Sequence, residues 1–283
     1  MTPPLGAHES TAGGLALAFG RGEAIGCDAL QIFVKNASQW QAKPLGETEV
    51  ATFRAAHEKS PIGPLVAHAA YLINLAAPDP AILAKSRAAL ADELARCALV
   101  GVPGLVVHPG AHLGRGEEAG LAAIAESLDA VYATIPDCPT LTLLELTAGQ
   151  GTVLGRTLGE LERIRQQAKV SRAKLAVCLD TCHAFAAGYA LDDAKGFEDF
   201  LAEIDGTVGF DAIRCVHVND SVGARGSRKD RHANLGEGLI GLDLFARLLA
   251  EPRFAQIPMI LETPLGDDEQ GHARDLATLR GLV

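Results

Sequence analysis

The sequence lacks the features that would place the protein in a membrane or outside the cell. No apolar run approaches the roughly 20 residues that a membrane-spanning helix requires. The opening stretch, MTPPLGAHES, has no charged region followed by an apolar core, so it does not resemble a secretory signal. No two cysteines are spaced as CxxC. We therefore expect a soluble, cytoplasmic protein.

The cysteines favour the same compartment. They are scattered along the chain at positions 27, 97, 138, 178, 182 and 215. Cys178 and Cys215 lie in apolar, strand-like runs, where a thiol behaves as a small hydrophobic group. This distribution is typical of a protein from a reducing compartment rather than of a disulfide framework.

An excess of positive charge is also missing. The formal net charge of −10 at pH 7 argues against a protein that coats nucleic acid nonspecifically. Nucleic acid stays open as a partner, because bound divalent cations would cancel several of the negative charges. The hydrophobic fraction of 48% argues against disorder, and a chain of 283 residues can bury a substantial core.

Short apolar runs alternate with helical segments along the whole chain. The predicted strands are residues 5–8, 29–34, 65–68, 104–108, 141–145, 175–179, 212–217 and 258–262. The predicted helices are residues 15–25, 47–59, 78–99, 116–131, 158–167, 197–204, 242–249 and 272–282. This alternation predicts parallel strands joined by crossover helices.

The number of strand–helix units favours one α/β architecture. An open, doubly wound sheet is an alternative, but eight units in a chain of this length favour a closed (β/α)8 TIM barrel. No Gly/Ser linker or break in composition divides the chain. We therefore expect a single domain over residues 1–283.

Ionisable residues recur where the predicted strands end. The carboxyl ends of the strands in such a barrel converge on one face, where active sites are built. Those ends carry His68, His108, Glu145, Asp180, His217 and Glu262, and adjoining segments supply His183, Asp230 and His232. Imidazole and carboxylate ligands without thiolate suit zinc, manganese or iron.

Each of these residues also has a plain structural explanation. A histidine at a strand end is often only hydrogen-bonded, and Asp180 or Thr181 is suited to cap a helix. However, six such residues at six of eight predicted strand ends are hard to explain one by one. Because a carboxylate cluster without cations would repel itself, we predict a site of two or more metal ions. His8 also ends a strand and is left outside this ligand set.

Longer motifs resemble those of a known family. HAAYLINL (68–75), CLDTCHAFAAGY (178–189), HVNDS (217–221) and DRHANLGEG (230–238) closely resemble motifs of the endonuclease IV family, the apurinic/apyrimidinic (AP) endonuclease family 2. Further matches, in the same order as in the family, are GAHESTAGG, FVKNASQW, HPGAH, TAGQG and ILET. The resemblance covers essentially the whole chain.

The resemblance implies a TIM barrel that holds three Zn2+ ions, with Mn2+ or Fe2+ as alternatives at one or more positions. The first ion would be held by His68, His108 and Glu145. Glu145 would bridge to a second ion, held also by Asp180, His217 and Glu262. The third ion would be held by His183, Asp230 and His232.

The resemblance also implies the reaction and the substrate. The substrate would be double-stranded DNA with abasic sites, cut on the 5′ side to leave a 3′-hydroxyl and a 5′-deoxyribose phosphate. Blocked 3′ ends would be cleaned by the same site. Glu145 and Glu262 would assist in deprotonating the attacking water. A monomer in the bacterial cytoplasm, associated with the nucleoid through DNA, is expected.

DNA contacts are expected from two places in the sequence. Tyr71 matches the family's aromatic wedge, which fills the gap left by an extruded nucleotide, although a packed aromatic residue is the plain alternative. A basic loop precedes Asp230 and contains Arg225, Arg228, Lys229 and Arg231. Such a run is usually solvated surface, but beside a phosphodiester site it favours phosphate contact.

The chain departs from the family pattern at three positions. Ser38 stands where the family often has an arginine that inserts into DNA, and Val222 stands where it often has lysine. Leu146 replaces an asparagine after the bridging glutamate. These departures bear on DNA affinity and substrate range, because none of them removes a predicted metal ligand.

Two other functions are compatible with parts of the pattern. A sugar isomerase or epimerase also uses a metal-bearing barrel, but it does not need the trio His183, Asp230 and His232 or the basic loop. A DNA-damage binding protein that keeps the metals only for structure would bind lesions without cutting them. Incision of an abasic duplex, compared with turnover of ketoses, distinguishes these functions.

The departure at Ser38 generates a prediction about DNA binding. Because serine is too short to reach into a base stack, Tyr71 carries more of the wedge function here. Stacking on bases contributes roughly 1–3 kcal/mol, so Tyr71→Ala is expected to weaken binding of an abasic duplex about ten- to a hundredfold, with the metals retained. Ser38→Arg is expected to strengthen binding. A binding titration in which both variants match the wild type would contradict this account.

Overall fold

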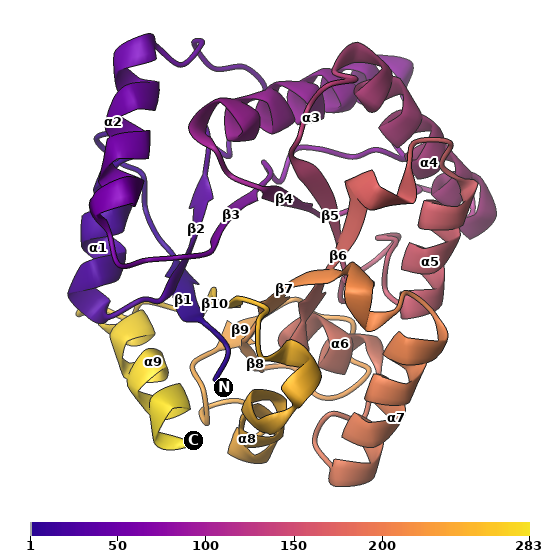
Figure 1. The fold of residues 1–283 in the computed structure, drawn as a ribbon. Helices are drawn as coiled ribbons and strands as arrows, with labels where there is room; N and C mark the ends of the chain where they lie inside the picture. The colour runs from indigo at the N-terminus through magenta and orange to yellow at the C-terminus, as the bar shows by residue number, and fades with distance from the viewer. Residues whose placement is uncertain (1) are drawn as a thin grey trace.

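The computed structural model describes residues 2–283, so Met1 of the predicted domain lies outside the described residues. Over this range eight parallel strands close into a barrel (Figure 1). The strands are β1 (Leu5–His8), β2 (Ala29–Phe33), β3 (Leu65–His68), β4 (Gly104–Val107), β5 (Leu141–Glu145), β6 (Leu175–Asp180), β7 (Ile213–His217) and β10 (Met259–Leu261). Around the ring they follow the order of the chain, and β10 closes the barrel against β1. The predicted (β/α)8 TIM barrel is confirmed.

Helices surround the barrel on its outer side (Figure 1). They are α1 (Leu17–Ile25), α2 (Glu47–Lys59), α3 (Pro80–Val100), α4 (Glu117–Thr134), α5 (Leu158–Gln167), α6 (Thr181–Ala187), α7 (Ala194–Gly206), α8 (Leu242–Ala250) and α9 (Gly271–Gly281). Within the described residues, no helix is long and apolar enough to cross a membrane. The helix ends follow local signals; for example, Asp79 caps α3 and accepts hydrogen bonds from the amides of Ala81 and Ile82.

The alternation of side chains along each strand builds two separate cores. Outward residues such as Leu65 and Ala67 of β3 join the large core between the barrel and the helices. The inward residues form a second, smaller cluster that lies on strands only: Ala29, Val66, Val106, Leu143, Ala176, Cys178, Cys215 and Ile260. Because successive residues of a strand point to opposite faces, this second cluster fills the barrel interior.

The predicted elements agree with the structure except near several ends and in one loop region. Helices α2 and α5 begin and end at the predicted residues, and β4 is one residue shorter than predicted. The structure adds α6 directly after β6, and a short antiparallel pair, β8 (Asp220–Ser221) and β9 (His232–Ala233). The pair was missed because two-residue strands carry no periodicity, and it fixes where the basic loop and Asp230 lie.

The close contact of β1 with β2 generates a prediction about stability. A Cβ atom added at Gly6 would lie 1.9 Å from the backbone oxygen of Ala29, so Gly6→Ala forces the strands apart. We expect the free energy of unfolding to fall by about 1–3 kcal/mol or more. Gly20→Ala is the matched control, because Gly20 is exposed in α1 and a Cβ there would meet nothing within 4 Å. It should stabilise by about 0.5–1 kcal/mol. Equal unfolding midpoints for the two variants would contradict the prediction.

Candidate metal centre

The period of the strands places the predicted ligands on the inner side of the barrel mouth. His68, Glu145, Asp180 and His217 are the last residues of β3, β5, β6 and β7, and His108 and Glu262 directly follow β4 and β10. Each lies two residues beyond a member of the inner cluster. Because side chains two residues apart share a face, all six continue the interior layer upward as a polar layer.

Glu145 lies at the centre of this layer. Its side chain is fully buried, and four imidazoles surround the carboxylate. Oε2 lies 3.2 Å from Nε2 of His68 and 2.9 Å from Nε2 of His108. Oε1 lies 3.3 Å from Nδ1 of His183 and 3.0 Å from Nδ1 of His217. The carboxylate therefore faces two different groups of donors with its two oxygens.

The first two donor groups share Glu145. Ligand atoms of His68, His108 and Glu145 lie within 4.8 Å of one another, and so do those of Glu145, Asp180, His217 and Glu262. In the second group, Nδ1 of His217 lies 3.1 Å from Oε2 of Glu262 and 3.8 Å from Oδ2 of Asp180. Each group could hold a metal ion, with nitrogen and oxygen donors in proportions that suit zinc.

The third donor group joins α6 to the β8–β9 pair. Oxygens of Asp230 lie 3.2 Å from Nε2 of His183 and 3.4 Å from Nε2 of His232. Both nitrogens are buried, and within residues 2–283 their contacts with Asp230 are ion-pair distances without the geometry of a hydrogen bond. A buried polar atom without a partner is costly. A cation between these three side chains would satisfy both nitrogens, so the residues present fit a metal ion.

The electrostatics of the layer also favour bound cations. Burial alone raises the pKa of the Glu145 carboxyl, but His108 and His217 outweigh it and hold that pKa well below its ordinary value. Burial lowers the pKa of the His183 and His217 imidazoles, but the carboxylates around them raise it well above its ordinary value. The carboxylates thus stabilise positive charge inside a buried site. Divalent cations would supply that charge without protonating the imidazoles.

Asp180 caps a helix and also lies in one of the donor groups. Its Oδ1 accepts a hydrogen bond of 2.7 Å from the amide of His183, so it caps α6. Its Oδ2 lies within the second donor group and accepts a hydrogen bond of 2.8 Å from the side-chain amide of Asn219. The cap fixes the turn that carries His183, and so places one donor of the third group relative to the second.

Three neighbours hold the donors in place; from the sequence, His8 was expected to orient a ligand or contact substrate, whereas Gln31 and Asn219 were not assigned a function. The Gln31 amide group donates to Oε1 of Glu262 at 2.7 Å, and its Oε1 lies 2.8 Å from Nε2 of His217. Nδ1 of His8 lies 3.2 Å from Oε1 of Glu262. Asn219 accepts a hydrogen bond from the backbone amide of Glu262. Gln31 lies inside an apolar strand, and a buried polar residue there was the available signal.

The predicted DNA-contacting residues lie in different environments. Tyr71 is 63% exposed, and its ring lies 5.4 Å from that of His68 and 6.1 Å from that of His108. It therefore stands at the rim of the donor layer rather than packed in the core. Arg225 pairs with Asp192 at 3.0 Å, which leaves Arg228 and Lys229 as better candidates for phosphate.

The last residue of the basic loop is exposed, and so are two of the three departures from the family pattern. Arg231 is exposed and donates a hydrogen bond to the backbone oxygen of Asp230. Ser38 is exposed, and its amide donates to Oδ1 of Asn36. Val222 is 62% exposed, whereas Leu146 is fully buried and belongs to the large core. Leu146 therefore replaces a polar residue by a packing residue.

Comparisons with known proteins agree with the barrel fold. A family model described as "Xylose isomerase-like TIM barrel" matches residues 19–282. Probable endonuclease 4 of Chloroflexus aurantiacus is 48% identical over 281 residues, which cover 99% of this chain and 98% of that protein. The chain belongs to the endonuclease IV family. Probable endonuclease 4 of Geobacter sulfurreducens is 44% identical, with 100% of this chain and 95% of that protein covered.

A solved structure of the family extends the match to three dimensions. Endonuclease IV from Thermus thermophilus superposes with a TM-score of 0.87 at 39% identity, covering 99% of this chain and 98% of that chain. The family that the motifs indicated is therefore confirmed. A D-tagatose 3-epimerase-like protein has a TM-score of 0.75 at only 18% identity, which shows a shared fold alone. The fold by itself therefore gives no support to the sugar isomerase or epimerase hypothesis.

The contacts of Gln31 generate a prediction about metal affinity. Gln31→Leu keeps the size of the side chain but leaves His217 and Glu262 without their partner. We expect the free energy of unfolding to fall by about 1–3 kcal/mol. Metal affinity should fall roughly ten- to a hundredfold, because groups that orient ligands tune binding. Chelator competition and thermal unfolding measure the two effects.

A second buried polar residue provides the control. Thr142 is fully buried on β5, where its hydroxyl contacts the Tyr132 hydroxyl of α4 at 3.0 Å on the outer side of the barrel. Thr142→Val is expected to lower stability without changing metal affinity. If both variants lose metal equally, or if Gln31→Leu binds metal as the wild type does, Gln31 does not position the ligands.

Proposed function

We propose that the chain is a zinc-dependent AP endonuclease of base excision repair. It hydrolyses the phosphodiester bond on the 5′ side of abasic sites in duplex DNA, and leaves a 3′-hydroxyl and a 5′-deoxyribose phosphate. The family makes the chain a DNA-repair endonuclease, and the observation that carries the finer proposal is the convergence of three donor groups around Glu145. Removal of blocking groups from 3′ ends is a second reaction of the same site.

The metal ligands are assigned group by group. Three Zn2+ ions would be held, with Glu145 shared by the first two. The first group is His68, His108 and Glu145, the second is Glu145, Asp180, His217 and Glu262, and the third is His183, Asp230 and His232. Mn2+ or Fe2+ could replace zinc at one or more positions, because the donors are imidazole and carboxylate.

The bound ions supply Lewis-acid stabilisation of the negative charge that develops on the phosphate, and they lower the pKa of water. The carboxylates of Glu145 and Glu262 accept the proton of the attacking water. Glu262 is the better placed of the two, because its side chain is 13% exposed at the barrel mouth whereas that of Glu145 is fully buried. Gln31 and His8 hold Glu262 in position through hydrogen bonds to Oε1.

The rim of the barrel mouth binds the DNA. Tyr71 projects beside His68 and His108, so it can fill the gap left by an extruded abasic nucleotide directly above the donor layer. Arg228, Lys229 and Arg231 contact phosphates next to Asp230, and Arg225 contributes once it leaves Asp192. The protein acts as a monomer in the cytoplasm, where it associates with the nucleoid through DNA.

The shared carboxylate generates the test of this function. Because Glu145 belongs to two donor groups, Glu145→Ala should lower the metal content from about three ions per chain to one and abolish incision 5′ to an abasic site. His232 belongs only to the third of these groups, so His232→Ala should lose a single ion. Elemental analysis and an incision assay with 3′-end analysis measure both effects.

Three results would be incompatible with the proposal. A metal content of one ion or none in active wild-type protein would show that there is no trinuclear site. Near-normal incision by Glu145→Ala would show that Glu145 is not the shared ligand. Damage-dependent binding without incision by the metal-loaded wild type would instead favour a non-catalytic binding protein.

A further inference from the structure

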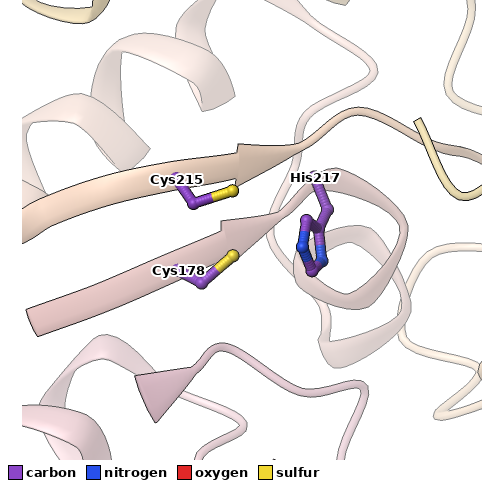
Figure 2. A group of neighbouring side chains, drawn as sticks. All are labelled: Cys178, Cys215 and His217. Carbon is purple, nitrogen blue, oxygen red and sulfur yellow. The ribbon is translucent and has the colours of Figure 1, made fainter. Parts of the chain in front are cut away.

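A pair of thiols lies directly below the polar layer. Cys178 of β6 and Cys215 of β7 are register partners on neighbouring strands, and both are fully buried. They belong to the inner cluster that fills the barrel. Figure 2 shows both sulfur atoms pointing toward the ring of His217, which lies two residues beyond Cys215 on the same face. The three side chains therefore meet inside the barrel.

The donor atoms of this trio are close together. The two sulfurs and a ring nitrogen of His217 lie within 4.8 Å of one another. The register of β6 against β7 places Cys178 directly beside Cys215. The donors of the candidate centre above are imidazole and carboxylate, whereas two of the three donors here are sulfur. Soft cations prefer such a set, because thiolate is the soft ligand among protein side chains.

We propose that Cys178, Cys215 and His217 form an additional metal site that takes a soft divalent cation of the cadmium type. The site itself depends only on the three side chains. Its competition with the zinc centre rests on the proposed function, in which His217 is a zinc ligand.

Binding of one ion between the two sulfurs requires little movement of the side chains. A zinc–sulfur distance of roughly 2.3 Å places two thiolates of one ion about 3.8 Å apart, and a larger cation needs a somewhat wider separation. The two sulfurs already lie within 4.8 Å of each other. Binding forms two metal–sulfur bonds, breaks two S–H bonds and releases two protons to solvent, with no transfer of electrons. Two thiolates and a divalent ion have no net charge, which suits a buried position.

The two sites compete for His217. A ring nitrogen of His217 lies within 4.8 Å of both sulfurs, and its Nδ1 lies 3.0 and 3.1 Å from the carboxylates of Glu145 and Glu262. An ion that draws the imidazole toward the sulfurs moves it away from these carboxylates. A soft ion in the thiol site therefore withdraws one ligand from the second donor group. The barrel interior thus contains a position at which a thiophilic cation inhibits the enzyme without binding to the DNA surface.

Cadmium is a suitable probe because thiolate-to-cadmium charge transfer absorbs in the near ultraviolet, where zinc–imidazole and zinc–carboxylate sites do not. Zinc-loaded protein is titrated with Cd2+ in a thiol-free reductant. We expect a charge-transfer band that saturates at one Cd2+ per chain and the release of two protons per ion. Incision should fall at least about tenfold, because one zinc ligand is withdrawn.

Variants of the cysteines identify the site. The double variant that combines Cys178→Ala and Cys215→Ala should lose the band and keep incision in the presence of Cd2+. Each single variant should lose about half of the band, which guards against a double variant that folds poorly. The matched control is Cys97→Ala with Cys138→Ala, because these buried cysteines also lie near each other but belong to none of the candidate metal groups within residues 2–283. This control should keep both the band and the inhibition.

Several outcomes would overturn the proposal. They are a wild type without the band, a band that survives in the double variant at 178 and 215, and a band that is lost in Cys182→Ala instead. The last result would assign the ion to Asp180, Cys182 and His232. The band tests the thiol site even if the protein has no incision activity, so failure of this proposal and failure of the proposed function can be told apart.

Discussion

One buried carboxylate organises the mouth of this barrel. Glu145 has no exposed surface, and its two oxygens lie between 2.9 and 3.3 Å from the imidazoles of His68, His108, His183 and His217. A buried anion is tolerated only when it is paired. The four histidines lie in β3, directly after β4, in α6 and in β7, so this requirement ties distant parts of the chain to one point. Under the proposed function, metal ions shared through Glu145 would meet the same requirement.

In the closed barrel, side chains that lie two residues apart on a strand point to the same face and form stacked layers of different chemistry. Along each of six strands an apolar or thiol side chain is followed, two residues later, by a donor, so a dry layer supports a polar one. Gln31 and Asn219 connect neighbouring donors by hydrogen bonds and hold Glu262 from two sides. In the layer below, β6 and β7 supply soft sulfur ligands, Cys178 and Cys215. Hard and soft donors thus meet at His217.

Much of the fold and of the donor set could be predicted from the sequence. The apolar runs identified the barrel strands, because the length and period of a buried strand are local properties. Residues such as His68 and Glu145 were found because the end of a parallel strand in a barrel has a known position. Gln31 could be noticed as a polar residue inside an apolar strand, but the sequence gives no sign of the partners it reaches. The ion pair of Arg225 with Asp192 was likewise invisible, because it depends on how two loops approach each other.

The sequence by itself therefore determined which residues alternate, which end a strand and which family the chain belongs to. The tertiary structure decided which of these residues meet. His68 and Glu145 are 77 positions apart, and Gln31 and His217 are 186 apart, so their contacts exist only once the barrel has closed. The pairing of Cys178 with Cys215 depends on the register of β6 against β7. The physical reason is that side-chain direction follows from local backbone geometry, whereas register and closure follow from hydrogen bonds and packing between distant segments.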